Sequence, residues 1–297
     1  MNRLVIGCGY LGLRVASHWK ALGDEVAVLT RSQERAEALS TQGFKPVVGD
    51  VMSPASLAQL PDSDTILYAV GFDRSGGHSK RNVYVEGLRN VLTQIRGRCG
   101  RLIYVSSTSV YGQSSGESVD ETSATDPVEE NGRICVDAES ALRQSFGPPI
   151  NNRAIVLRLA GIYGPGRLLA RIDQLKQGEP LTGNPAAWLN LIHVDDAVLA
   201  VIAADERGTL GETYLVCDDR PLRRIEYYSA LAERVGAAPP RFAELAPDSS
   251  ERRQLNKRCM NHRLRGELGV ELRYPTIIAG LDDRPEALRG TGPLRSE

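Results

Sequence analysis

The feature that most constrains this chain is the glycine pattern within its first twelve residues, MNRLVIGCGYLG. An apolar run over residues 3–6 precedes Gly7, Gly9 and Gly12, which stand in the order G-x-G-x-x-G, and a segment of helical periodicity follows. This combination predicts a buried strand that turns tightly into a helix. A chain that begins in this way is expected to continue as alternating strands and helices.

Each glycine has its own physical role in a strand–turn–helix unit of this kind. Gly7 allows the tight turn, Gly9 lets a pyrophosphate approach the backbone, and Gly12 lets the helix pack closely on the strand. Free N–H groups at the start of the helix attract the phosphates, and Tyr10 and Leu11 belong to the same cofactor-binding loop. The pattern predicts a dinucleotide site. A plain strand-to-helix turn is the alternative, because glycine-rich turns are common.

The end of the second expected strand, residues 25–30, indicates which dinucleotide binds. In NAD sites an Asp or Glu about 20 residues beyond the glycines bonds the ribose 2′-hydroxyl, and it would repel a 2′-phosphate. This chain has Arg31 and Ser32 there, and an arginine fork with a hydroxyl suits a phosphate dianion. The sequence therefore predicts NADP rather than NAD. The alternative is that Arg31 is only a solvated residue at the start of a helix.

The ends of the next two strands supply the other expected cofactor contacts. Asp50 and Val51 close the third strand, where they are placed to meet the edge of the adenine. Ala69, Val70 and Gly71 close the fourth strand, and these small residues let the backbone lie against a ribose. Both assignments follow from position, since ligands of open α/β sheets bind at the carboxyl ends of the strands.

Apolar periodicity alternates between strand and helix along most of the chain. Strands are expected at residues 3–6, 25–30, 46–49, 65–69, 101–106, 154–159 and 213–217. Helices are expected at residues 11–22, 31–39, 83–95, 138–146, 194–204, 224–235 and 263–268. Because helical crossovers join parallel strands, this alternation predicts an α/β fold built on a doubly wound parallel Rossmann sheet.

The regular alternation breaks after the sixth strand, which suggests how the chain divides. Residues 1–160 are expected to form a nucleotide-binding Rossmann domain that about 191–217 completes. Glycine and proline interrupt 161–190, so long regular elements are not expected there. Together with 218–283 this segment is assigned to a small C-terminal substrate lobe. The polar end, 284–297, is expected to be a flexible tail.

Composition limits the kinds of partner. The chain has 36 Lys and Arg against 37 Asp and Glu, a formal charge of −1, so no bulk field attracts nucleic acid or an anionic membrane. The five cysteines are scattered without metal-type spacing, which predicts reduced thiols and no metal site. With neither a signal-type leader nor a membrane-length apolar run, we expect a cytoplasmic protein that acts on a small molecule. The oligomeric state stays open.

Five motifs in order resemble the extended short-chain dehydrogenase/reductase family, in its epimerase/dehydratase branch. They are GCGYLG near the N-terminus, GDV at 49–51, SSTSVYG at 106–112, RLAGIYGPGR at 158–167 and LIHVDDAV at 191–198. The resemblance implies a Rossmann domain and a small C-terminal lobe that closes over the nicotinamide. It also implies catalysis by a Ser or Thr, a Tyr that transfers the proton, and a Lys that lowers the pKa of that Tyr.

The family's serine is present, and its tyrosine–lysine pair is replaced. Ser107 matches the serine that orients the substrate hydroxyl, and Tyr111 in the same motif is a candidate proton donor. With Glu139 aligned to the glutamate of the family's helix, Asn131 stands at the tyrosine position and Cys135 at the lysine position. Asn has no titrating proton, and a thiol supplies no fixed positive charge. The chain therefore resembles atypical members that keep the nucleotide fold and lack the Tyr-x-x-x-Lys dyad.

Other side chains are candidates for the missing chemistry, each with a structural alternative. Tyr163, on the turn after the sixth strand, is a candidate cofactor contact. His193 titrates in a range that suits acid–base work, although a hydrogen-bonded core histidine is favoured. Arg133 is either a substitute cation or a solvated residue. Asp195 and Asp196 are expected to stabilise the start of a helix.

Two functions from different classes follow. The first is an NADP-dependent oxidoreductase or epimerase/dehydratase that acts on a small hydroxyl or carbonyl compound or a nucleotide-linked sugar, with non-standard or weakened catalysis. A nucleotide-linked sugar would need basic residues for its own pyrophosphate, and the candidates are Arg167, Arg171, Arg252 and Arg253. The second is a catalytically silent NADP-binding protein that works as a sensor or regulator. A proton donor beside Ser107 would favour the first.

Overall fold

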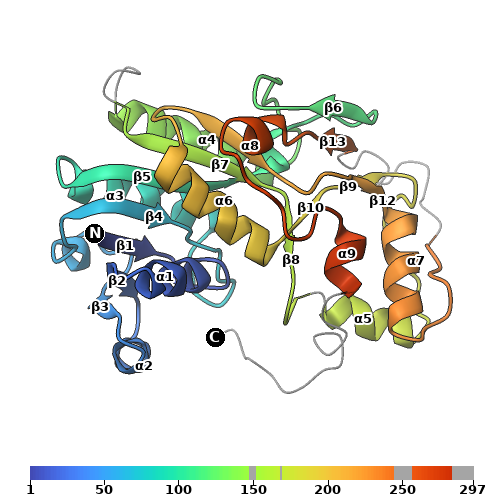
Figure 1. Ribbon diagram of the computed structural model, residues 1–297, viewed down its shortest axis with the longest axis horizontal. Helices are drawn as coiled ribbons and strands as arrows, with labels where there is room; N and C mark the ends of the chain where they lie inside the picture. The colour runs from blue at the N-terminus through green and yellow to red at the C-terminus, as the bar shows by residue number, and fades with distance from the viewer. Residues whose placement is uncertain (147–151, 168, 244–255, 283–297) are drawn as a thin grey trace.

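The computed structural model describes residues 1–146, 152–167, 169–243 and 256–282. The expected flexible tail, 284–297, and the candidate phosphate ligands Arg252 and Arg253 lie outside the described residues. A parallel sheet with helices on both faces forms the larger part of the structure, and a smaller group of helices and short strands lies beside it (Figure 1).

The central sheet has seven strands in the described part of the chain. They are β1 Asn2–Ile6, β2 Glu25–Thr30, β3 Lys45–Val48, β4 Ser63–Tyr68, β5 Cys99–Ser107, β7 Ala154–Leu159 and β11 Thr213–Val216. Their order is β3-β2-β1-β4-β5-β7-β11, and every neighbouring pair is parallel. The strand order reverses between β1 and β4, which confirms the predicted doubly wound sheet. A crevice for a ligand is expected at the carboxyl ends of these two strands.

Helices cover both faces of the sheet. On one face lie α1 Gly12–Ala21, α2 Gln33–Thr41 and α6 Val194–Arg207, and on the other lie α3 Gly87–Ile95 and α4 Glu130–Phe146. Three short helical turns are η1 Pro54–Leu57, η2 Asn82–Glu86 and η3 Thr108–Val110. Trp19 of α1 is fully buried on the first face and Leu88 of α3 on the second. Burial of these apolar helix faces holds the three layers together.

A smaller group of elements lies beside the sheet, at the right of Figure 1. It contains α5 Leu169–Lys176, α7 Arg224–Arg234, α9 Ile277–Asp282, and the strand pairs β8 Gly161–Tyr163 with β10 Leu191–His193 and β9 Trp188–Leu189 with β12 Leu222–Arg223. Tyr227, Leu231 and Ile277 are buried in a core of its own. This group contains much of the expected substrate lobe, whose residue bounds stay a prediction.

The chain returns from this group to the sheet near its C-terminus. Strand β13 Lys257–Cys259 pairs in parallel with β6 Glu117–Val119, and α8 His262–Gly266 follows it. Leu264 of α8 is fully buried in the same core as α1 and α6. The C-terminal segment therefore contributes to the larger unit as well as to the smaller one.

Helix α4 begins at Glu130, well before the expected start at Ala138. Gly132 lowers the helix propensity of this stretch, but a Cβ at Gly132 would lie 2.3 Å from the backbone oxygen of Ser109. Close packing on the segment after β5 therefore extends the helix beyond what local propensity predicts. As a result, Asn131 and Cys135 are both helical and lie one turn apart.

The described residues contain neither a membrane-crossing helix nor a metal-ligand cluster. Across these ranges no helix is long and apolar enough to span a membrane. In the same part of the chain no three His, Cys, Asp or Glu side chains gather in a way that could hold a metal ion. All five cysteines are buried and unpaired.

Candidate functional site

The glycine loop between β1 and α1 is shaped by close backbone packing on one side and open space on the other. Gly7 has a φ of +98°, and a Cβ there would lie 2.4 Å from the carbonyl carbon of Ala69. A Cβ on Gly12 would lie 2.2 Å from the backbone oxygen of Gly7. A Cβ on Gly9 would have nothing within 4 Å. Gly7 and Gly12 thus allow the chain to pack, and the space beside Gly9 is open, where the approach of a pyrophosphate stays a prediction.

The start of helix α1 can receive an anion. Leu11 at the N-cap has no side-chain acceptor, and the first turn contains no acidic residue. The first N–H groups of a helix lack backbone partners inside it, and they attract phosphate. Helix α2 differs, because Ser32 Oγ accepts a hydrogen bond from the Arg35 N–H at 3.2 Å. The geometry of α1 therefore fits a pyrophosphate.

Tyr10 links the glycine loop to the segment after β8. Its hydroxyl donates to the carbonyl oxygen of Pro165 at 2.9 Å. The guanidinium carbons of Arg14 and Arg167 lie 4.2 and 4.3 Å from the centre of its ring, which is cation–π distance. Two positive charges are thereby held beside the loop. Contact between Tyr10 or Leu11 and a cofactor stays a prediction.

At the end of β2 the expected phosphate ligand is ion-paired. Arg31 Nη2 lies 2.7 Å from Asp73 Oδ2, and both side chains are partly exposed. Hydrogen bonds from Arg31 and Ser75 lower the pKa of Asp73 to about 2, so this carboxyl is charged at neutral pH. Asp73 lies in the connection after β4. A ligand phosphate would compete with Asp73 for Arg31.

A second arginine lies at the same strand end, and the sequence reasoning did not find it. Arg35 Nη2 donates to the carbonyl oxygen of Cys8 in the glycine loop at 2.8 Å. Arg35 lies in the first turn of α2, three residues after its N-cap Ser32. That place, directly after the strand end with Arg31 and Ser32, is the signal that would have identified Arg35.

Hydrogen bonds fix the chain at the ends of β3 and β4, where the adenosine contacts are predicted. Asp50 Oδ1 accepts from the Met52 N–H at 2.8 Å, which holds the carboxyl at the end of β3. The Val51 carbonyl accepts from Asn90 at 2.8 Å. Ala69, with Val70 and Gly71 directly after it, is bonded through its N–H to the Ile6 carbonyl at 2.8 Å. Ala69 and Val70 adjoin Gly7 of the glycine loop, and the cofactor contacts of both strand ends stay predictions.

Ser107 lies at the carboxyl end of β5, half-buried. Its Oγ accepts a hydrogen bond from the Ser109 N–H at 3.1 Å, and the Ser109 hydroxyl lies 3.5 Å from Cys135 Sγ. Burial raises the pKa of the Cys135 thiol, so this side chain stays neutral at neutral pH. Helix α4 therefore presents a neutral side chain beside the serine motif, at the position where the family resemblance implies a lysine.

Tyr111 is fully buried, and its hydroxyl is bonded inside the protein. Arg158 Nη1 donates to it at 3.0 Å, and the same guanidinium forms a two-point contact with Glu139 at 3.0 and 2.8 Å. Ser106 also donates to Glu139 at 2.7 Å. Burial raises the pKa of Tyr111 to about 12. This geometry favours a structural role, and the catalytic assignment of Tyr111 stays a prediction.

Tyr163 and His193 pack against each other at the ends of the paired strands β8 and β10. Tyr163 is 2 % exposed, and a Cβ on Gly280 of α9 would lie 2.1 Å from its hydroxyl. The two ring centres are 5.1 Å apart. His193 Nδ1 accepts from the Asp195 N–H at 3.2 Å, so this side chain caps α6. Burial makes packing the favoured role of Tyr163, whose predicted cofactor contact stays untested.

Asp196 ties the C-terminal segment to the start of α6. Its two carboxylate oxygens accept from the backbone N–H groups of Arg273 and Tyr274 at 2.7 and 3.0 Å. Burial raises its pKa, although these two hydrogen bonds oppose that effect. Asp196 therefore holds structure, as the sequence analysis expects.

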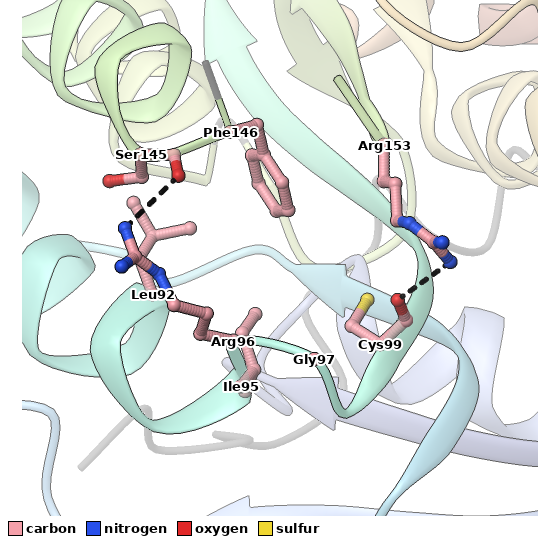
Figure 2. A pocket seen from close by; sticks show the side chains of 8 residues that line it. All are labelled: Leu92, Ile95, Arg96, Gly97, Cys99, Ser145, Phe146 and Arg153. Atoms are coloured by element: carbon pink, nitrogen blue, oxygen red, sulfur yellow. Dashed lines mark hydrogen bonds between the residues drawn. The ribbon is translucent and has the colours of Figure 1, made fainter. Parts of the chain in front are cut away.

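A cavity of about 300 Å³ lies at the other end of the sheet (Figure 2). Cys99, the first residue of β5, and Arg153, just before β7, form one wall, and Arg96 and Phe146 lie opposite. Parallel sheets bind ligands at the carboxyl ends of their strands, whereas this cavity adjoins the amino ends. It is therefore separate from the glycine loop and from Ser107.

A doubly wound parallel sheet with an open glycine loop at its carboxyl edge defines the class of dinucleotide-binding Rossmann proteins. Within that class, the family model for the NAD dependent epimerase/dehydratase family matches residues 3–217. The chain belongs to this family, which lies in the extended short-chain dehydrogenase/reductase group. Its fold is accordingly an NAD(P)-binding fold.

Known relatives match most of the chain. Protein YeeZ of Escherichia coli K12 is 28 % identical over 279 residues, which span 91 % of this chain and 95 % of that protein. Human short-chain dehydrogenase/reductase family 42E member 1 is 28 % identical over 265 residues, 79 % of this chain and 67 % of that protein. A solved structure of a putative NAD-dependent epimerase/dehydratase from Methylobacillus flagellatus is 32 % identical, with a TM-score of 0.77 over 97 % of this chain and 99 % of that one.

Proposed function

We propose that this chain is an NADP-dependent oxidoreductase, or an epimerase/dehydratase-like enzyme, that acts on a small hydroxyl or carbonyl compound or a nucleotide-linked sugar. One observation carries the cofactor choice: Arg31, Ser32 and Arg35 gather at the end of β2, where an NAD site would have a carboxylate. Arg31 is partly neutralised by Asp73. A 2′-phosphate, with its greater negative charge, is a stronger partner for two arginines than one carboxylate.

The residues around the glycine loop support binding of the rest of the cofactor. Open space at Gly9 and the uncapped start of α1 favour a pyrophosphate, and Asp50 at the end of β3 favours the adenine. A bound nicotinamide cofactor supplies or accepts hydride. The chain's own residues then have to orient the substrate oxygen and hold its proton.

Ser107 is the residue best placed to orient the substrate oxygen. A hydroxyl has one donor and two acceptor sites, and the Ser109 N–H uses one of the acceptor sites. The Ser107 O–H therefore remains able to donate to a substrate oxygen at the end of β5. With Asn131 and Cys135 at the tyrosine and lysine positions, we expect proton transfer to be weaker than in members that have the dyad.

The test is turnover of a panel of aldehydes, ketones and nucleotide-linked sugars with NADPH, followed by loss of NADPH absorbance. Ser107→Ala is expected to lower kcat/KM on the best substrate at least tenfold, since a positioned hydrogen bond to the reacting oxygen is lost. Affinity for NADPH is expected to stay within twofold. Turnover that survives Ser107→Ala unchanged would refute the assignment.

A catalytically silent NADP-binding sensor is the second candidate. It is favoured by the Tyr111 hydroxyl, which is committed to Arg158, and by the neutral thiol of Cys135 on α4. Tight NADPH binding without turnover of any compound in the panel would support this candidate over the enzyme.

A further inference from the structure

We infer that Lys80 supplies the positive charge at the nicotinamide end of the site that helix α4 lacks. This inference rests on the proposed function, because it requires a nicotinamide dinucleotide to bind at the carboxyl ends of the strands. Lys80 lies in the connection between β4 and η2, outside every motif that carries the family resemblance.

The Lys80 ammonium lies against the α4 positions where the resemblance implies the dyad. Lys80 Nζ donates to Asn131 Oδ1 at 3.0 Å, and Asn131 stands at the tyrosine position. Its charge also acts on Cys135, at the lysine position, where it partly opposes the rise in thiol pKa that burial causes. A cation from a different part of the chain thus contacts the residue at the tyrosine position, and its field reaches the residue at the lysine position.

Two contacts hold the ammonium in place without neutralising it. One is the Asn131 amide oxygen, which is uncharged, and the other is the ring of Tyr84, whose centre lies 5.3 Å from Lys80 Nζ. Next to Lys80, Arg81 is ion-paired with Asp137 of α4 at 2.7 Å, and both of these side chains are largely exposed, so the pair contributes little to holding the segments. The charge of Lys80 therefore stays available to a ligand.

The backbone after Lys80 is also unusual. Residues Asn82–Glu86 form a wide π-helical turn that runs directly into α3. Single π-helical turns within or beside an α-helix are rare, and they are often found at functional sites. Here the wide turn lies between Lys80 and the buried part of α3, and it contains Tyr84.

Sheet order indicates which half of a dinucleotide would meet Lys80. With the pyrophosphate at the glycine loop after β1, the phosphate-bearing adenosine lies towards Arg31 at the end of β2. The nicotinamide half then extends over the ends of β4 and β5, on the opposite side of the order reversal. Lys80 follows β4, and its partner Asn131 follows β5. The structure therefore assigns Lys80 to the nicotinamide half.

The experiment compares a whole cofactor with its adenosine half. Calorimetric dissociation constants for NADPH and for 2′,5′-ADP are measured on wild type, Lys80→Met and Arg81→Ala. Lys80→Met keeps an unbranched chain over Tyr84 and removes the charge. It is expected to weaken NADPH about tenfold, the effect of one lost charge-assisted hydrogen bond, with 2′,5′-ADP unchanged. Arg81→Ala removes a neighbouring charge that faces Asp137, and both ligands are expected to bind as in wild type.

The outcomes separate this inference from the function on which it rests. Unchanged NADPH affinity in a folded Lys80→Met protein, with 2′,5′-ADP still bound, overturns the assignment of Lys80 alone. If wild type binds neither ligand, the proposed cofactor site fails, and the role of Lys80 fails with it.

A second test places a positive charge on α4 itself. In the Lys80→Met background, Cys135→Lys places an ammonium at the family's lysine position, and it is expected to restore NADPH affinity to within threefold of wild type. Thermal unfolding on the same sample establishes that the double variant is folded. A folded double variant that binds NADPH no better than Lys80→Met contradicts the idea that the two positions serve the same ligand group.

Discussion

Arg31 and Asp73 form an ion pair of 2.7 Å across the mouth of the expected adenosine site. Arg31 follows β2 and Asp73 follows β4, so their contact bridges the two sides of β1 at the carboxyl edge of the sheet. The free protein therefore already holds a carboxylate where a 2′-phosphate is expected to bind. Cofactor preference depends on the competition between these two anions for the same guanidinium.

The first prediction concerns that competition. Asp73→Asn is expected to raise NADPH affinity about two- to fivefold and to leave NADH affinity unchanged, because Arg31 loses its competing anion. Calorimetry on both cofactors checks it. Asp62→Asn, which breaks the exposed ion pair with Arg98 near the amino ends of the strands, is the matched control. Equal gains for NADPH and NADH would show that Asp73 does not act through the phosphate.

The second prediction tests the arginine that lies beside the glycine loop. Arg35→Ala is expected to weaken NADPH about tenfold and NADH less than twofold, since a charged donor to the phosphate is lost. Arg98→Ala, which removes a charge at the opposite edge, is expected to change neither. A similar loss for both cofactors would mean that Arg35 supports the loop through Cys8 rather than binding the phosphate.

The third prediction separates the two kinds of glycine in the loop. Gly9→Val is expected to abolish dinucleotide binding in a protein with a native circular dichroism spectrum, because the new side chain would fill open space at the loop. Gly12→Val is expected to prevent normal folding, because its Cβ would lie 2.2 Å from the Gly7 oxygen. Retained NADPH binding in Gly9→Val would locate the cofactor elsewhere.

The fourth prediction concerns the buried hydroxyl of Tyr111. Tyr111→Phe leaves an Arg158 N–H without its acceptor, which is expected to lower the free energy of unfolding by about 1–3 kcal/mol. NADPH affinity is expected to be unchanged if the role is structural. Denaturant titration and calorimetry on one sample measure both quantities. A variant of unchanged stability that loses all turnover would instead make Tyr111 the proton donor.

The fifth prediction is a pH dependence that Asp218 causes. Burial raises the pKa of this carboxyl to about 7 in the folded protein, above its value in the unfolded chain. Between about pH 4 and 7 the folded state therefore binds the extra proton, and stability falls as pH rises, by up to about 1.4 kcal/mol per unit. Melting temperatures from pH 4 to 8 are expected to fall less steeply in Asp218→Asn than in wild type. Parallel curves for the two proteins would assign the slope to other groups.

Much of the fold could be predicted because each element carries its own periodicity. Apolar runs such as 3–6 and 154–159 match strands β1 and β7 to within a residue. The roles of Gly7, Gly9 and Gly12 could be predicted for the same reason. The tight turn, the open space and the close helix–strand contact that they allow all depend on the nearby backbone. The parallel order of the strands followed from helical crossovers, which leave few allowed connections.

The candidate site could be predicted only where its residues lie next to a strand end. Examples are the residues that come directly after the strands expected at 25–30 and 101–106, namely Arg31, Ser32 and Ser107. Lys80 and Asn131 are 51 residues apart, and no motif links them. Only the packing of α4 beside the connection after β4 brings them within hydrogen-bond distance.

Burial is what the tertiary structure alone decided. Tyr111 and Tyr163 both stand in glycine-containing motifs at strand ends, a position that usually offers side chains to a ligand. Arg158, which Glu139 holds in place, donates to the hydroxyl of the first, and Gly280 of α9 packs on the second. Those neighbours come from distant parts of the chain. Local spacing sets which way a backbone turns, but the segments that later pack over a side chain determine whether it reaches solvent.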